Sequence, residues 1–240
     1  GLGKSLIRGN VFFENLLDSN GFRISGNYQT VKTSYFDLKK LLPKPLASLP
    51  TEITQLGTIR FTGNNALTSE AVVTEGIITT DLGTVNLDLA MTGLQDADNA
   101  GYEGTVIVDD FNLGKLFNDE RLGNATFNLD VDGKGFIQET VNTKLSGTIA
   151  SLNYNDYTYK DITIFGNLKA PVFDGEVLID DPNARGKFNG LVDISKDVNS
   201  YDLEAQIDYA DLVTLNFIND SISILKGNAV VDMKGTGIEN

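Results

Sequence analysis

Three residue types are absent from this chain of 240 residues: cysteine, histidine and tryptophan. Without Cys the chain forms no disulfide and offers no thiolate to a metal ion. Without His it has no imidazole base, no Ser-His-Asp triad and no common ligand for transition metals. These absences exclude most hydrolase mechanisms, and no pair of carboxylates stands out for acid–base catalysis. We therefore expect a protein that is not an enzyme and that holds neither a cofactor nor a metal ion.

Long apolar runs and an excess of positive charge are also missing. No run of 18 apolar residues occurs, so the sequence predicts no helix that spans a membrane. Lys and Arg total 19 against 33 Asp and Glu, and the resulting net charge of −14 disfavours nucleic acid as a partner. With 24 Gly, only 5 Pro and 41% hydrophobic residues, the composition is typical of a folded β protein and not of a disordered chain.

The dominant pattern from residue 11 onward is alternation of apolar and polar residues, which is typical of strands with one apolar face. In residues 85–91, for example, four apolar side chains alternate with Asn86, Asp88 and Ala90. No long helical segment and no β-α-β alternation is present, so the pattern predicts a curled antiparallel sheet with one solvated face and one covered apolar face. The apolar face would be covered either by the opposite wall of a sandwich or barrel, or by a ligand in an open groove.

Three short segments, near residues 36–42, 111–117 and 210–215, interrupt the strands and share one pattern. Each has an apolar residue, then Asp or Asn, then Leu, and a second Leu three residues later. An Asp or Asn side chain caps the free N–H groups of a first helical turn, and the flanking apolar pair has the spacing of a hydrophobic staple. We therefore expect three short amphipathic helices, whose caps are Asp37, Asn112 and Asp211.

One segment has a spacing close to that of a calcium-binding loop. Asn128, Asp130 and Asp132 precede Gly133, and Glu139 follows at the expected distance, with Asn in place of the first Asp. The residues between them are apolar, as in a strand whose carboxylates face solvent. The polar face of a strand is therefore the favoured interpretation.

Several strand–turn–strand segments resemble a known family. Residues 76–89, 188–193 and 123–133, together with the Asp-Leu-x-x-Leu helices, are similar to units of the AsmA-like superfamily, and most like its TamB family of translocation and assembly module subunits. The use of Asn, Asp, Lys and Tyr resembles the versions found in Bacteroidota. The resemblance covers roughly residues 20–240 and carries over no catalytic residue.

The resemblance implies an all-β fold with a few short amphipathic helices, in the form of an elongated, curled antiparallel β-sheet groove (a β-taco). Residues 1–240 would be an internal fragment of one continuous groove, with approximate repeat units 1–65, 66–135 and 136–240. Such proteins cross the periplasm, are anchored in the inner membrane by a segment outside this fragment, and conduct phospholipid toward the outer membrane. The protein would bind a TamA-like barrel of the Omp85 type through regions outside this fragment.

The groove would be lined by apolar residues that share one phase of the alternation. The expected lining residues are Val85, Leu87, Leu89, Met91, Val106, Val108, Phe127, Leu129, Val131, Leu203, Ile207 and Tyr209. Glycines in the same phase, Gly26, Gly104, Gly147 and Gly190, would leave room beside larger neighbours or mark bends.

Other functions remain open at this level. The first is a structural or protein-binding scaffold that assists outer-membrane protein assembly or secretion with an Omp85-type barrel, by pairing with strand edges. The second is a secreted carbohydrate-binding or adhesin module, or an enzyme, which the lack of Trp and His disfavours.

Overall fold

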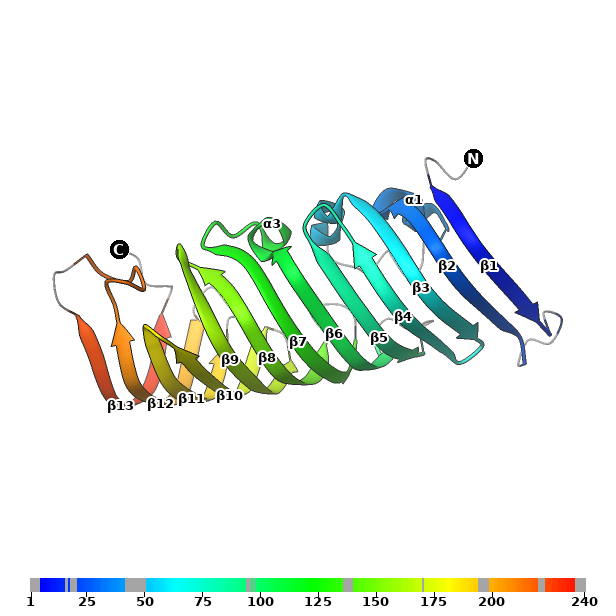
Figure 1. Ribbon diagram of the computed structural model, residues 1–240. Helices are drawn as coiled ribbons and strands as arrows, with labels where there is room; N and C mark the ends of the chain where they lie inside the picture. Colours follow the sequence, from blue (N-terminus) through cyan, green and yellow to red (C-terminus); the bar gives the residue numbers. More distant parts are fainter. Residues whose placement is uncertain are drawn as a thin grey trace.

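The computed structural model is a single sheet of 13 antiparallel strands that follow one another in chain order (Figure 1). The structure describes residues 5–15, 17, 21–41, 51–93, 96, 98–135, 140–169, 171–193, 199–219 and 223–235. The expected all-β class, with antiparallel pairing and few short helices, is confirmed. Because β1 and β13 form opposite edges and do not pair with each other, the sheet is open and is not a barrel.

The strands are between 9 and 13 residues long. They are β1 (Leu6–Glu14), β2 (Arg23–Ser34), β3 (Thr58–Thr68), β4 (Ala71–Thr79), β5 (Thr84–Thr92), β6 (Gly101–Asn112), β7 (Leu122–Lys134), β8 (Asn142–Tyr154), β9 (Tyr157–Lys169), β10 (Val172–Asp181), β11 (Ala184–Asp193), β12 (Asn199–Asp211) and β13 (Ile224–Gly235). The helical elements are α1 (Tyr35–Leu41), the 3₁₀ helix η1 (Thr51–Leu56) and α3 (Leu113–Phe117).

The strands form where the sequence alternates, and the burial pattern follows the alternation. In β7, the residues from Phe127 to Val131 switch between partly buried apolar and exposed polar positions. The side chains of one phase therefore lie on one face of the sheet and those of the other phase on the opposite face. Bulges interrupt the register at several pairs, including β6–β7 and β12–β13.

The connections alternate between the two ends of the strands, and one end carries the helical elements of the described residues. α1 and η1 lie between β2 and β3, and α3 lies between β6 and β7 (Figure 1). At the same end, β8 and β9 are joined by Asn155 and Asp156, which have φ of 53° and 60°. A tight hairpin turn requires positive φ at both central residues, and Asn and Asp tolerate it well. We call this end the helical rim.

Two clusters of buried apolar residues lie at the helical rim. One cluster combines Leu82, Val108 and Phe111, with Leu113 and Leu116 of the α3 region packed against it. The other is built around Tyr159, Ile162, Ala184, Ala210 and Leu215 near β8–β12. Among the described residues, no helix is both long and apolar enough to span a membrane.

The third expected helix is absent from the structure. Residues 212–216 form hydrogen-bonded turns, and Leu215 N donates to Asp211 O at 2.9 Å. The first expected helix is present as α1, which begins at Tyr35, three residues earlier than a cap at Asp37 implied.

Candidate functional site, an uncovered apolar face

The cross-strand register lines up the apolar residues of successive strands into continuous rows. In one row, which we call the first row, every member from β1 to β10 is apolar and large, and glycine appears only near the end. Its members are Ile7, Val31, Phe61, Ile78, Val85, Val108, Phe127, Ile149, Ile162, Ile179, Gly186, Ile207 and Gly227. The first row lies closest to the helical rim.

Three further rows run parallel to the first on the same face. The second row passes through Leu87, Val106 and Leu129, where neighbouring strands pair at these positions. The third passes through Leu89, Gly104 and Val131, and the fourth through Met91 and Tyr102. At about 4.8 Å between strands, the twelve strand-to-strand steps give each row a length of roughly 58 Å.

Eleven of the twelve residues expected to line a groove fall on these four rows. Val85, Val108, Phe127 and Ile207 belong to the first row, and Leu203 to the third. Tyr209 differs, because a register shift between Ile207 and Ala210 places it opposite Arg185. There the Arg185 guanidinium lies 5.4 Å, and the Lys226 ammonium 5.5 Å, from the centre of the Tyr209 ring.

No second layer covers the apolar face in the part of the chain that the structure describes. Substantial packing between elements is confined to neighbouring strands and to the helical elements at their rim. Most large side chains of the rows are half-buried by their own neighbours, although Val108 and Ile162 reach 5% and 6% exposure beside the rim. A sheet normally buries its apolar face against another element, so this uncovered face is the outstanding feature of the molecule.

The opposite face is mostly polar and solvated, although Ile77, Ile107 and Phe165 are also exposed on it. Neighbouring strands exchange side-chain contacts there: Thr105 Oγ1 donates to Asp130 Oδ1 at 2.8 Å, and Lys187 Nζ lies 2.6 Å from Glu176 Oε2. Asp130 and the neighbouring Asp132 are exposed on this face, as the strand interpretation of the calcium-like spacing expected. Among the described residues, no group of three or more acidic side chains is placed to hold a metal ion. Glu139 lies outside the described residues.

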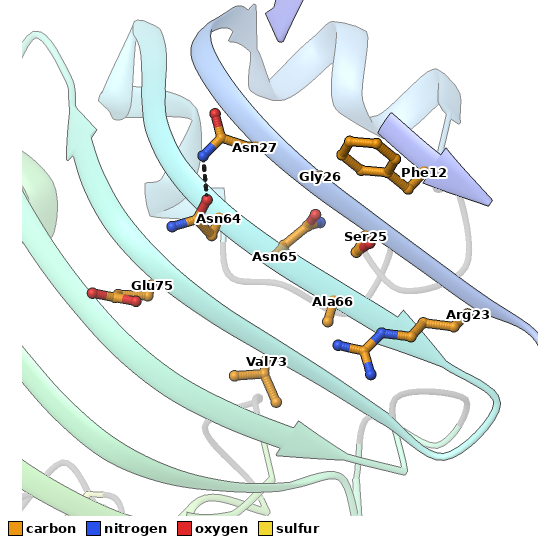
Figure 2. A pocket seen from close by; sticks show the side chains of 10 residues that line it. All are labelled: Phe12, Arg23, Ser25, Gly26, Asn27, Asn64, Asn65, Ala66, Val73 and Glu75. Atoms are coloured by element: carbon orange, nitrogen blue, oxygen red, sulfur yellow. Dashed lines mark hydrogen bonds between the residues drawn. The ribbon is translucent and has the colours of Figure 1, made fainter. Parts of the chain in front are cut away.

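The polar face is hollowed where β1 to β4 meet (Figure 2). This depression has a volume of about 350 Å³, and Asn27 Nδ2 donates to Asn64 Oδ1 across it at 2.7 Å. Its lining residues are Phe12, Arg23, Ser25, Gly26, Asn27, Asn64, Asn65, Ala66, Val73 and Glu75. Arg23 and Glu75 are exposed and the depression is wide open, so it offers no enclosed site for chemistry.

α3 is fastened to the helical rim by its cap and by apolar contacts. The Asn112 side chain accepts a hydrogen bond from Lys115 N at 2.7 Å, which is the expected capping contact. Phe111 is 5% exposed and belongs to the same cluster as Leu113 and Leu116. A helix of 5 residues has little stability alone, so these contacts hold it in place.

The other two expected caps occupy different positions. Asp37 lies inside α1, where Ser34 Oγ accepts from Asp37 N at 3.3 Å and takes the capping role. The Asp37 carboxylate instead accepts from Ser5 Oγ and Lys40 Nζ. Asp211 accepts from Thr214 N at 3.2 Å, a bond that lowers the pKa of its carboxyl, but it starts a turn and not a helix. The side chain of Leu41 lies outside the described residues.

An apolar cleft opens where the first row loses its side chains at Gly186 and Gly227. It has a volume of about 310 Å³, and the turn that contains Leu212 and Leu215 lies at its rim end. Its lining residues are Tyr159, Ile179, Ala184, Arg185, Gly186, Phe188, Ile207, Tyr209, Ala210, Leu212, Leu215, Phe217 and Leu225. The cleft is continuous with the apolar rows, since Ile179 and Ile207 belong to both.

One carboxylate is fully enclosed at the helical rim. Asp181 is 1% exposed and accepts from Tyr157 Oη at 2.5 Å, from Lys160 N at 3.0 Å and from Asn183 N at 2.8 Å. Burial, followed by the bond to Asp181, raises the pKa of Tyr157. Burial, followed by its neighbour Tyr157, raises the pKa of Tyr159 to about 12. The cluster ties the β8–β9 turn to the β10–β11 turn and is structural in character.

The glycines of the apolar face serve the backbone and do not widen a groove. At Gly104, Gly147 and Gly190, φ lies between 139° and 151°, and a Cβ would meet backbone atoms of the adjacent strand. At Gly26, a Cβ would collide with the ring of Tyr28, which lies over it. The alternative expectation, that these glycines mark special backbone positions, agrees with this geometry.

Sequence reasoning missed the full extent of the rows. It selected lining residues from β5 to β7 and from β12, yet Phe61, Ile78 and Ile149 continue the first row through other strands. The same alternation marks those strands, so the signal was present. No family model, no curated protein and no solved structure matches the chain.

Proposed function

We propose that the chain is part of a hydrophobic groove that conducts phospholipid across the periplasm, between the inner and the outer membrane, and so supports outer-membrane biogenesis. One observation carries the proposal: an apolar row crosses all 13 strands with three further, largely apolar rows beside it, and no second layer covers them among the described residues. An uncovered apolar surface of this length needs an apolar occupant, and large exposed apolar patches mark sites of interaction.

Energetics favour a smooth face for this task. An acyl chain loses about 0.8 kcal/mol for each CH₂ group that steps from an apolar surface into water. Along the first row, large apolar side chains follow one another from Ile7 to Ile179 without a polar interruption. A chain that moves along such a row meets no large barrier, because each contact that it leaves is replaced by a similar one.

The proposal includes a stronger curl than an open sheet requires. The strands bow along their length (Figure 1), and further curling toward the apolar face would form the trough of a β-taco. The resemblance to the TamB family of the AsmA-like superfamily supports this form. It also supports an inner-membrane anchor and an Omp85-type, TamA-like barrel as a partner, both through regions other than these residues. The protein would carry lipid without acting as an enzyme.

Photocrosslinking tests the proposal with a matched pair of positions in β5. Leu87 lies in the second apolar row, whereas its chain neighbour Asn86 is exposed on the polar face. A photoreactive amino acid at Leu87 should capture phospholipid from vesicles, detected by mass spectrometry, and one at Asn86 should not. Equal and minimal capture at both positions would overturn lipid conduction.

The open edges favour a second candidate, the structural or protein-binding scaffold. Several apolar side chains of the edge strands are exposed, such as Phe13 at 59% and Val230 at 79%. Unpaired edges of this kind accept further strands. Under this second function, polypeptide would crosslink at an edge position such as Val230, and Leu87 would capture no lipid, so the same experiment distinguishes the two.

A further inference from the structure

The two edge strands carry nearly the same sequence. β1 reads Leu-Ile-Arg-Gly-Asn-Val-Phe-Phe-Glu from Leu6, and β13 reads Ile-Leu-Lys-Gly-Asn-Ala-Val-Val-Asp from Ile224. All nine positions agree in chemical type: two aliphatic residues, a cation, Gly-Asn, three apolar residues and an acid. Both strands have odd numbers in a sheet whose neighbouring strands are antiparallel, so they run in the same direction. They differ in their surroundings, because β1 pairs with β2 on the side where β13 has an open edge.

A second, independent observation comes from glycines with φ between 139° and 156° on the apolar face. In odd-numbered strands, a Cβ at these glycines would meet the backbone of the following strand: Gly9 would meet β2, Gly63 would meet β4 and Gly190 would meet β12. In even-numbered strands it would meet the preceding strand: Gly104 would meet β5, and Gly147 would meet β7. These glycines therefore allow one particular neighbour to approach closely.

Gly227 has the same conformation and no such neighbour. Its φ is 151°, close to the 156° of Gly9 in β1, yet no atom lies within 4 Å of where its Cβ would stand. Because β13 is an odd-numbered strand, a Cβ at Gly227 would point toward the following strand position, which is the open edge of the sheet. A residue other than glycine would be strained at this φ, so the position keeps a costly backbone geometry that only a further strand would use.

We infer that the outer edge of β13 binds a further antiparallel strand of the β2 type, an extended polypeptide segment with a tyrosine opposite Gly227 and a cation beside Asp232. The bound strand would pair with β13 in the register that β2 has with β1. The residue equivalent to Tyr28 would lie opposite Gly227, as Tyr28 lies opposite Gly9. The residue equivalent to Arg23 then lies beside Asp232, as Arg23 lies 4.0 Å from Glu14.

Charge on the polar face favours the same partner. Asp232 lies directly opposite Asp202 in the β12–β13 pair. Like charges opposite each other destabilise a sheet, and a cation on the other side of Asp232 would offset that repulsion. The bound strand would also extend the apolar rows, since Tyr28, Gly26 and Ile24 lie on the apolar face of β2. The inference does not depend on lipid conduction, because strand addition uses the edge and not the face.

A peptide with the sequence of residues 23–34 tests the inference directly. With a fluorescent label it should bind the 240-residue chain saturably in an anisotropy titration, whereas a scrambled peptide should bind at least tenfold more weakly. Hydrogen exchange should show new protection in β13. Equal binding of the scrambled peptide, no binding of either, or protection confined to β1, would overturn the inference.

Two variants of the chain form a matched pair for the same titration. Gly227→Val places a side chain where the incoming backbone would lie and should weaken peptide binding at least tenfold. Ala229→Val adds similar bulk on the same face of the same strand and should change binding less than twofold. Equal binding by the two variants would overturn the inference. If Gly227→Val does not fold, a peptide with Asn27→Pro replaces it, because Asn27 pairs with Asn10 in β1 and would pair with Asn228 in β13; loss of its backbone N–H should weaken binding to the same extent.

Discussion

The helical rim and the open apolar face use the same kind of residue in different ways. At the rim, α3 and the turn before β13 cover the ends of the strands, so that Phe111 is 5% and Leu215 2% exposed. On the face, equally apolar side chains such as Leu87 and Leu129 stay half-buried, with no second layer among the described residues. Alternation alone does not distinguish these two environments.

The difference separates stability from the proposed function. A buried side chain contributes its full transfer free energy to folding, while a half-buried one contributes less and keeps apolar surface for a ligand. We therefore expect substitutions at the rim to affect unfolding most, and substitutions on the face to affect lipid binding most.

The largest expected effect is the loss of lipid capture when a carboxylate interrupts the face. Leu129→Asp places a charge beside the acyl chain, where it is poorly solvated, and should abolish crosslinking of lipid at Leu87. Asn128→Asp, on the exposed polar face next to it, should leave crosslinking unchanged. Circular dichroism should show that both variants keep their strands. Lipid capture by Leu129→Asp at the level of the unchanged chain would contradict the prediction.

The rim should show the converse behaviour. Phe111→Ala leaves a cavity in the cluster with Val108 and Leu82, and should lower the free energy of unfolding by about 3–5 kcal/mol. Urea denaturation measures the loss, while lipid crosslinking at Leu87 should persist under conditions where the variant is folded. The control is Phe117→Ala, since Phe117 is 57% exposed and should cost much less. A similar cost for the two variants would show that the rim is not a core.

Removal of the enclosed carboxylate should also destabilise the rim. Asp181→Ala leaves Tyr157 Oη and the backbone N–H groups of Lys160 and Asn183 without their acceptor, which should cost about 3 kcal/mol. Asp180→Ala changes an exposed neighbour in the same strand and should stay within about 0.5 kcal/mol. Urea unfolding of the two variants compares them, and equal values would contradict the role assigned to Asp181.

A smaller effect is expected at the helix caps. Asn112→Ala removes the bond to Lys115 N and should cost about 1 kcal/mol. Asp37→Ala should cost less, because Ser34 caps α1 and the Asp37 contacts are near the surface. Thermal unfolding resolves the difference. A larger loss for Asp37→Ala would indicate that the cap position expected from the sequence is the correct one.

Alternation was sufficient to predict the all-β class, the antiparallel pairing and the face on which most of the candidate residues lie. It did not reveal that Tyr209 leaves the four rows, because a bulge depends on the pairing of two strands, although Tyr209 still lines the apolar cleft. The capping pattern also predicted a helix after Asp211, where the structure has turns. An Asp side chain that accepts from the backbone N–H three residues later can start a turn as well as a helix.

The enclosed carboxylate was not predictable for a related reason. In the sequence, Asp181 is one of several acidic residues at strand ends, and it stands next to a Pro-Asn turn. Its burial arises from Tyr157, 24 residues away, which reaches it only once β9 and β10 have paired.

The smallest effect concerns Tyr159, and it is absent at neutral pH. Burial raises the pKa of this phenol to about 12, above the ordinary value of 10.0 that we expect in the unfolded chain. Below pH 10 both states keep the proton, so the fold gains and loses nothing. Between pH 10 and 12 the unfolded chain releases the proton first, and stability falls as the pH rises.

Tyr159→Phe should therefore unfold like the unchanged chain at pH 7 but lose less stability between pH 10 and 11.5 in urea titrations. Tyr28→Phe, in β2 and away from the Tyr159 cluster, is the control and should follow the unchanged chain throughout. Parallel alkaline loss in the Tyr159→Phe variant would show that this phenol ionises as freely in the folded state as in water, and that the rim is wetter than its geometry indicates.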